Sequence, residues 1–274
     1  MDEQTLARCR QLAKEVRVSC LKMVHKGKSG HIGSMLSMAD ILPVLYLDVL
    51  NVDPQNPKKA DRDRFLLSKG HGGAALLATL AKLGFFPESW LNEYYCDNGK
   101  LSGHISHHIP GVEFSTGSLG HGLPVACGMA MAAKQAGQKH RIFCMSSDGD
   151  LNEGSSWEAI MLAGQHHWDN LIMMVDYNRL QALGRSEDII DLESLRAKLE
   201  LFGWAVREAD GHDQVAISKA LSDLPVCTGK PSAVIFRTVK GKGVSFMEDK
   251  YQWHYGGLTD ELTAQAIAEV EAAK

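Results

Sequence analysis

Two short polar segments follow apolar runs and carry side chains that could bind a metal ion. Asp148 and Gly149 lie just beyond the run at 141–145, and Asn178 lies thirty residues later, just beyond the run at 171–175. A carboxylate and an amide oxygen are ligands that Mg²⁺ takes together with phosphate oxygens. Gly149 has no Cβ, so its backbone could approach such a phosphate. The spacing indicates a hard cation bound to a diphosphate, although an isolated Asp-Gly is more often a turn, and both interpretations stay open here.

The elements that would position these side chains alternate between helix and strand. An α/β fold with a doubly wound, mainly parallel sheet and helices on both faces is therefore expected. In such a sheet, ligands bind at the carboxyl ends of the strands, where Asp148 and Asn178 would lie. Strands are predicted at 141–147, 171–176, 205–209 and 233–238, and helices at 5–25, 37–50, up to 83, 124–135, 155–166, after 212 and from 259.

Two segments are predicted to be loops. The polar, Gly- and His-rich stretch at 98–122 has little periodicity, and loops of that length are usually functional or disordered. The segment Lys240–Gly243 is too short for a phosphate-binding loop with a Walker motif and is expected to be flexible.

Composition excludes several classes of protein. The chain has 274 residues and a net charge of −4, with no dense tract of Lys and Arg, so nucleic acid is not an expected partner. The amino terminus lacks the basic and then apolar layout of a secretory signal. The most apolar stretch, 41–50, is too short to span a bilayer, so no membrane association is expected.

Cysteine usage and uniform composition favour a single cytoplasmic domain. The six cysteines form no CxxC pair, which is typical of reduced thiols and of a cytoplasmic protein. No linker, repeat or composition break interrupts the chain, so residues 1–274 are predicted to form one domain.

Five segments, in order along nearly the whole chain, resemble the transketolase family. The spacing of Asp148, Gly149 and Asn178 is similar to the family's thiamine diphosphate signature, although Ser147 replaces the first glycine. Ile32 stands where a proline is usual. The other four segments are KSGHIG at 28–33, LSKGHG at 67–72, GVEFSTGSLGHG at 111–122 and WHYG at 253–256.

The resemblance implies a magnesium ion, or another divalent cation such as Ca²⁺ or Mn²⁺, bound with thiamine diphosphate. The implied metal ligands are Asp148, Asn178 and the backbone carbonyl of Leu180. Gly149 and His71 would contact the diphosphate, so that Asp148, Asn178, Gly149 and His71 all belong to the cofactor site.

Further roles follow from the same resemblance. Gly117 and Leu119 would line the cofactor's rings, and Glu153 is similar to a buried glutamate that links paired cofactor sites across a subunit interface. Three histidines would meet the hydroxyl and carbonyl groups of the sugar, because imidazoles titrate near neutral pH and suit proton transfer. They are His31, His104 and His254.

Other residues are given no catalytic role. Ser118 and His121 belong to a variant of the family motif and have no assigned function. The cluster at 104–108 could suggest zinc, but no carboxylate or thiol has a convincing spacing nearby, so a metallohydrolase is a poor alternative. The remaining histidines are expected to be solvated or structural: His25, His107, His108, His140, His166, His167 and His212.

Chain length gives the last expectation. Full-length members of the family add pyrimidine-binding and C-terminal domains after such a segment, whereas this sequence stops at Lys274. The resemblance therefore implies the N-terminal subunit of a split transketolase. Such a subunit would be inactive alone and would form an α₂β₂ assembly with a C-terminal subunit that carries the pyrimidine-binding domain.

The implied reaction is transfer of a two-carbon ketol unit between sugar phosphates, including pentose or sulfosugar routes. The alternatives are an E1-type subunit of a 2-oxo acid dehydrogenase, against which segment 111–122 speaks, and a catalytically silent cofactor-binding partner.

Overall fold

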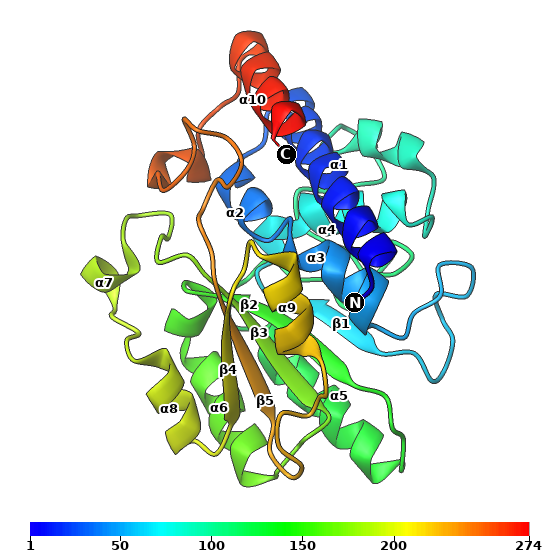
Figure 1. Ribbon diagram of the computed structural model, residues 1–274, viewed down its shortest axis with the longest axis vertical. Coiled ribbons are helices and arrows are strands. Elements are labelled where there is room, and N and C mark those ends of the chain that lie inside the picture. The colour runs from blue at the N-terminus through cyan, green and yellow to red at the C-terminus, as the bar shows by residue number, and fades with distance from the viewer. Residues whose placement is uncertain (274) are drawn as a thin grey trace.

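The computed structural model describes residues 1–273 and contains one five-stranded sheet (Figure 1). The strand order is β1-β2-β3-β5-β4 and every pairing is parallel, so all carboxyl ends lie at one edge. The chain adds β1, β2 and β3 side by side in one direction and then skips a position to form the outer strand β4. It returns to form β5 between β3 and β4, so the direction in which strands are added reverses after β4. The strands are β1 (Arg64–Leu67), β2 (Ile142–Ser147), β3 (Leu171–Tyr177), β4 (Ala205–Asp210) and β5 (Ser232–Arg237).

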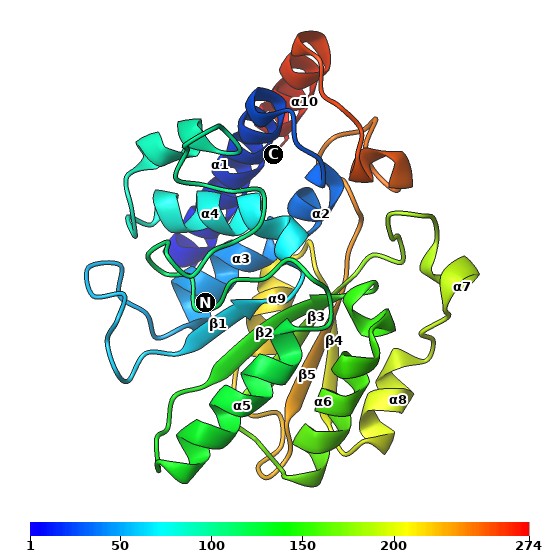
Figure 2. The ribbon, with the colours of Figure 1, turned by 180° about the vertical axis from the view of Figure 1, so that it is seen from behind.

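Alternate strand residues face two separate hydrophobic cores. On β2, Phe143 and Met145 belong to one core and Ile142 and Cys144 to the other, because successive side chains point to opposite faces. The first core is closed by α1 (Glu3–Gly27), α4 (Gly73–Lys82), α9 (Gln214–Leu221) and α10 (Asp260–Ala272). The second is closed by α5 (Gly122–Gln135), α6 (Gly154–Gln165) and α8 (Leu195–Leu201), which cover the sheet in Figure 2. The predicted doubly wound α/β fold is confirmed.

Side-chain caps begin several of these helices. Asp2 accepts a hydrogen bond of 2.7 Å from the Thr5 amide at the start of α1, and Asp213 accepts one of 2.9 Å from the Val215 amide at the start of α9. Such caps satisfy amide groups that have no partner inside the helix. None of the helices within residues 1–273 is both long and apolar enough to cross a membrane.

The structure differs from the sequence-based elements mainly in the first half of the chain. The helix predicted at 37–50 is broken in the structure: α2 (Ile32–Ser37) ends where the predicted helix begins, and the chain becomes helical again in α3 (Ile41–Val44) and a π-helical turn at Leu45–Val49. Pro43 explains the break, because proline has no amide hydrogen to continue a helix from α2, whereas it is tolerated in the first turn of α3. The short β1 was not predicted, nor were α7 (Ser186–Ile189) and α8.

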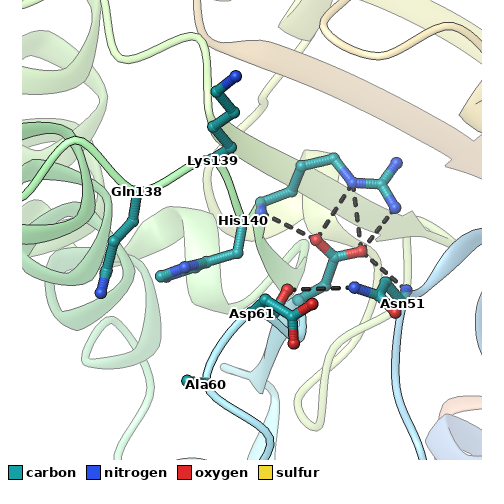
Figure 3. Close-up of a pocket in the computed structure, with 8 residues that line it drawn as sticks. Asn51, Ala60, Asp61, Gln138, Lys139 and His140 are labelled. Carbon is teal, nitrogen blue, oxygen red and sulfur yellow. Dashed lines mark hydrogen bonds and ion pairs between the residues drawn. The ribbon is translucent and has the colours of Figure 1, made fainter.

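A cavity of about 550 Å³ lies at the amino ends of β1 and β2, opposite the edge that carries Asp148 (Figure 3). Asp63 in its wall is buried and binds Arg141, whose Nη2 lies 2.6 Å from Asp63 Oδ2. The carboxylate also accepts hydrogen bonds from the amides of Asn51 and Arg141, both 2.9 Å long. Asp63 therefore ties the starts of two strands to the turn after Leu45–Val49.

We expect Asp63→Ala to lower the free energy of unfolding by about 3 kcal/mol, because Arg141 would lose its counter-ion and two amides their acceptor. Urea denaturation measures this. Asp61→Ala is the control, since Asp61 is exposed and its pair with Lys59 lies at the surface. A loss for Asp63→Ala no larger than for Asp61→Ala would contradict this account.

Candidate active site

Asp148 and Asn178 lie side by side at the carboxyl ends of β2 and β3. The strands pair Ser147 with Asp176, and each polar residue follows directly after its strand. Asp148 is 1% exposed, and its Oδ2 accepts hydrogen bonds of 3.1 Å from the amides of Asn178 and Arg179. Its Oδ1 is buried and has no hydrogen-bond partner among residues 1–273. A buried carboxylate oxygen left in this state is costly unless a cation or donor binds it.

Electrostatics at Asp148 also suit a cation. Burial, with the negative charge of Asp176 in second place, raises the pKa of Asp148 to about 7. The Asn178 side chain is half-buried, and its Oδ1 accepts a hydrogen bond of 3.0 Å from the Leu180 amide. The structure thus brings together Asp148 and Asn178, the two side chains predicted to hold a divalent ion.

The third predicted ligand, the Leu180 carbonyl, is bonded to a lysine that sequence reasoning did not assign to the site. Lys240 Nζ donates to the carbonyls of Leu180 at 3.1 Å and Gln181 at 3.0 Å, and lies 3.0 Å from His254 Nδ1. Lys240 is 1% exposed, and burial, then the charge of Lys69, lowers its pKa to about 8. The expected flexible loop therefore does not fit Lys240, which is anchored inside the site.

A small residue makes room for this lysine. A Cβ on Gly33 would lie 2.9 Å from Lys240 Cγ, so a larger residue there would push the lysine stem aside. The sequence signal that could have found Lys240 is its place three residues after Arg237, the last residue of β5, at the edge of the sheet where ligands lie.

Three of the predicted histidines form a cluster, and the fourth lies beside it. The ring centroid of His31 is 5.5 Å from that of His71, 4.8 Å from His254 and 5.8 Å from His104. His31 has a φ of 71°, and its amide donates to the His254 carbonyl at 2.5 Å. This hydrogen bond, made by a residue in the left-handed region, joins the segments at 28–33 and 253–256.

The clustered imidazoles are neutral at pH 7. Burial is the largest cause in each case: it lowers the pKa of His31 to about 4, that of His254 to about 3, and that of His71 well below its usual value. A neutral imidazole has one donor and one acceptor nitrogen. Because Lys240 donates to His254 Nδ1, the His254 proton lies on Nε2. These rings can therefore give or accept a hydrogen bond without holding a charge.

The end of the long loop connects the histidines to Asp148. A Cβ on Gly117 would lie 3.5 Å from the His104 ring, and one on Gly149 would lie 3.4 Å from Leu119 Cδ1. Asp150 fastens this segment, because its Oδ1 accepts hydrogen bonds of 2.7 Å from the Gly120 amide and 2.9 Å from Ser68 Oγ. Gly117 thus lies next to the His104 ring, and Leu119 lies next to Gly149, the residue that follows Asp148.

Comparison with known proteins decides the family. The model of the transketolase thiamine diphosphate-binding domain matches residues 9–270. The chain belongs to this family. Curated relatives include one of the subunits of apulose-4-phosphate transketolase from Actinobacillus succinogenes, 45% identical over 88% of this chain and 88% of its own. Another is a 6-deoxy-6-sulfo-D-fructose transketolase subunit of Clostridium sp., 40% identical over 94% of each chain.

Full-length transketolases match over part of their length. The crystal structure of transketolase from Campylobacter jejuni superposes with a TM-score of 0.90 and 34% identity, over 99% of this chain and 43% of that chain. Human transketolase is 34% identical over 98% of this chain and 43% of its own length. The chain thus spans less than half of these relatives, whereas it spans about nine-tenths of the subunits named above.

Some family motif residues lie apart from the cluster. Glu153 is exposed in the single chain, at the N-cap of α6 and in contact range of Gly120, where an added Cβ would lie 2.5 Å from Glu153 Cβ. Ser118 and His121 are exposed as well. His107 lies against His108 and Ser115, and within residues 1–273 no three His, Cys, Asp or Glu side chains gather closely enough to hold a metal ion.

A buried ion pair, also not predicted, lies behind the candidate ligands. Lys69 and Asp176 are both fully buried and bonded to each other, and Lys69 Nζ also donates to the Ser34 carbonyl at 3.0 Å. Asp176 further accepts hydrogen bonds from Ser37 and Thr238. Burial alone would raise the pKa of Asp176, but Lys69 and these donors lower it. Asp176 is therefore held as a carboxylate two residues before Asn178.

Proposed function

We propose that this chain is the thiamine diphosphate- and magnesium-binding N-terminal subunit of a two-subunit transketolase, which moves a two-carbon ketol unit between sugar phosphates. The observation that carries the proposal is the unpartnered Asp148 oxygen beside Asn178, at the edge of the sheet that also holds the neutral histidine cluster. The relatives described above are transketolases, which favours this activity over an E1-type dehydrogenase subunit.

In this proposal, Asp148, Asn178 and the Leu180 carbonyl hold the divalent ion. All three offer oxygen, which Mg²⁺ prefers and which Ca²⁺ or Mn²⁺ would also accept. In the structure, Lys240 donates a hydrogen bond to the Leu180 carbonyl. When the ion binds, Lys240 would release this carbonyl and direct its positive charge toward the diphosphate. Gly149 leaves its backbone open to a phosphate, since an added Cβ there would meet nothing closer than 3.4 Å.

The remaining residues would orient the sugar and move its protons. When bound, the thiazolium ring of thiamine diphosphate supplies an electron sink for the carbanion left by splitting the ketose. His31, His104 and His254 would give and accept hydrogen bonds at the hydroxyl and carbonyl groups of the sugar. His71 would contact the diphosphate, and Gly117 and Leu119 would line the rings of the cofactor.

A second chain is part of the proposal. The two relatives described above that match along about nine-tenths of their length are named as transketolase subunits, which supports the existence of a second chain. We infer that this partner is a C-terminal subunit that carries the pyrimidine-binding domain and that the assembly is α₂β₂. Glu153 is exposed in the single chain and would be buried there against another copy. We place the assembly in the cytoplasm, since all six cysteines are free thiols, and we treat residues 1–274 as one domain.

An activity assay tests this proposal. The purified chain, given thiamine diphosphate, Mg²⁺, xylulose 5-phosphate and a panel of aldose phosphate acceptors, is expected to show no ketol transfer until the protein encoded beside it is added. Transfer by the chain alone would refute its assignment to a split enzyme. A mixture that binds the cofactor and never turns over would instead favour the silent cofactor-binding partner. In parallel assays, apulose 4-phosphate and sulfofructose, the sugars in the names of the relatives, replace xylulose 5-phosphate as ketose donors.

A further inference from the structure

Lys240 is carried by a short segment that two distant side chains hold in place. The Val239 amide donates to His212 Nε2 at 2.8 Å, and Arg17 Nε donates to the Lys242 carbonyl at 3.1 Å. These bonds lie on either side of Lys240, one residue before it and two residues after it. The backbone on both sides of the buried ammonium is thus fixed by residues outside the histidine cluster.

The two side chains are joined through a single carboxylate. Arg17 Nη1 and Nη2 bind Asp40 Oδ1 at 3.0 Å and Oδ2 at 2.5 Å, and His212 Nδ1 lies 2.8 Å from Asp40 Oδ2. Because His212 Nε2 accepts from the Val239 amide, the proton lies on Nδ1 and is donated to Asp40. Burial would raise the pKa of Asp40, but Arg17 and His212 lower it to about 2, so the carboxylate stays charged.

These residues come from three parts of the helical layer over the first core. Arg17 lies on α1, Asp40 in the turn between α2 and α3, and His212 just before α9. Their side chains are only 9%, 13% and 12% exposed. Burying a network of charged and polar side chains costs desolvation free energy. Such a network is expected where it holds the backbone in one arrangement.

We propose that Arg17, Asp40 and His212 form a brace that positions Lys240, and through it the Leu180 carbonyl and His254, for binding of the cofactor's diphosphate. The inference rests on the proposed function and deepens it, because it assigns positioning residues outside the motifs of the site. Sequence reasoning gave His212 no role beyond a structural one. None of the three residues belongs to the candidate cofactor or sugar site, so the brace would act only through the segment that carries Lys240.

The test measures thiamine diphosphate affinity of the assembled enzyme by titration calorimetry in saturating Mg²⁺. His212→Leu removes both hydrogen bonds of the ring, and the dissociation constant is expected to rise about tenfold, as is typical when an outer support of a metal or cofactor ligand is removed. His212→Gln keeps an amide that can accept from Val239 and donate to Asp40, and is expected to restore most of the affinity.

Ser218→Ala on α9 is the matched control. It removes a partly buried hydrogen bond of 2.6 Å that Ser218 Oγ on this helix donates to Asp48, so it is expected to lower the melting temperature without changing cofactor affinity. An equal loss of affinity in Ser218→Ala, or wild-type affinity in His212→Leu, would overturn the brace. If His212→Leu does not yield folded enzyme, Asp40→Asn takes its place with the same expectations.

A double-mutant cycle separates positioning from general stability. In a Lys240→Met background, His212→Leu is expected to cause no further loss of cofactor affinity, because the group it positions is gone. Additive losses would contradict the inference even if the proposed function holds. Absence of cofactor binding by the unmodified assembly would refute the proposed function, and this inference with it.

Discussion

Asp148→Asn is expected to weaken magnesium-dependent binding of thiamine diphosphate severely while leaving the unliganded protein at least as stable as the unmodified one. The carboxylate is buried beside Asp176, and its raised pKa of about 7 reflects a charge that the folded protein holds at a cost. Asparagine has nearly the same shape and no charge. Its amide oxygen can still accept from Asn178 and Arg179, so the local fold has no reason to change.

The loss of cofactor affinity follows from charge. Removing one member of a buried, hydrogen-bonded charge pair typically costs about 2–5 kcal/mol, which is a loss of roughly thirtyfold to several thousandfold in affinity. Calorimetric titration with thiamine diphosphate and Mg²⁺ measures this loss, and thermal unfolding without ligands measures stability. An Asp148→Asn protein that binds cofactor within threefold of the wild type would refute the assignment of Asp148 as a metal ligand.

His166→Ala is the matched control for Asp148→Asn. His166 is exposed at the end of α6 and stacks on Trp168, away from the carboxyl ends of the strands. Neither cofactor affinity nor ketol transfer is expected to change by more than about twofold, in line with most surface substitutions. Opposite behaviour of the two variants, with His166→Ala impaired and Asp148→Asn intact, would place the site elsewhere in the protein.

The positions of Asp148 and Asn178 could be predicted because local sequence determines them. Each follows a run of buried residues in a strand, and parallel strands bring their carboxyl ends to one edge. The β1 strand has only four residues, and the buried stretch from 41 to 46 is apolar throughout, so neither the strand nor the break before α3 gives a clear hydrophobic period.

Interactions between distant segments could not be predicted in the same way. Lys240 reaches Leu180 and His254 only because Gly33, far away in the sequence, leaves room for its stem. The neutral state of His31 likewise depends on burial by segments that no local pattern brings together. Motif resemblance found the histidines, but their protonation comes from the packing of the folded chain.

Lys69→Met is expected to lower the free energy of unfolding by about 3–5 kcal/mol, because it leaves Asp176 buried without a counter-ion. Ser37 and Thr238 would still donate to the carboxylate, but two neutral donors do not replace a full positive charge. Urea denaturation of the unliganded chain measures the change. A loss below about 1 kcal/mol would indicate that Asp176 does not depend on Lys69 for its charge.

The double variant Lys69→Met with Asp176→Asn separates the effect of the unpaired Asp176 charge from the effect of changing the Lys69 side chain. It removes both charges while keeping an amide that can bond Ser37 and Thr238, so most of the lost stability is expected to return. Because Asp176 stands two residues before Asn178 and accepts weakly from its amide at 3.5 Å, restored stability need not restore cofactor affinity. A double variant as unstable as Lys69→Met would mean that Lys69 acts through its bond to the Ser34 carbonyl rather than through Asp176.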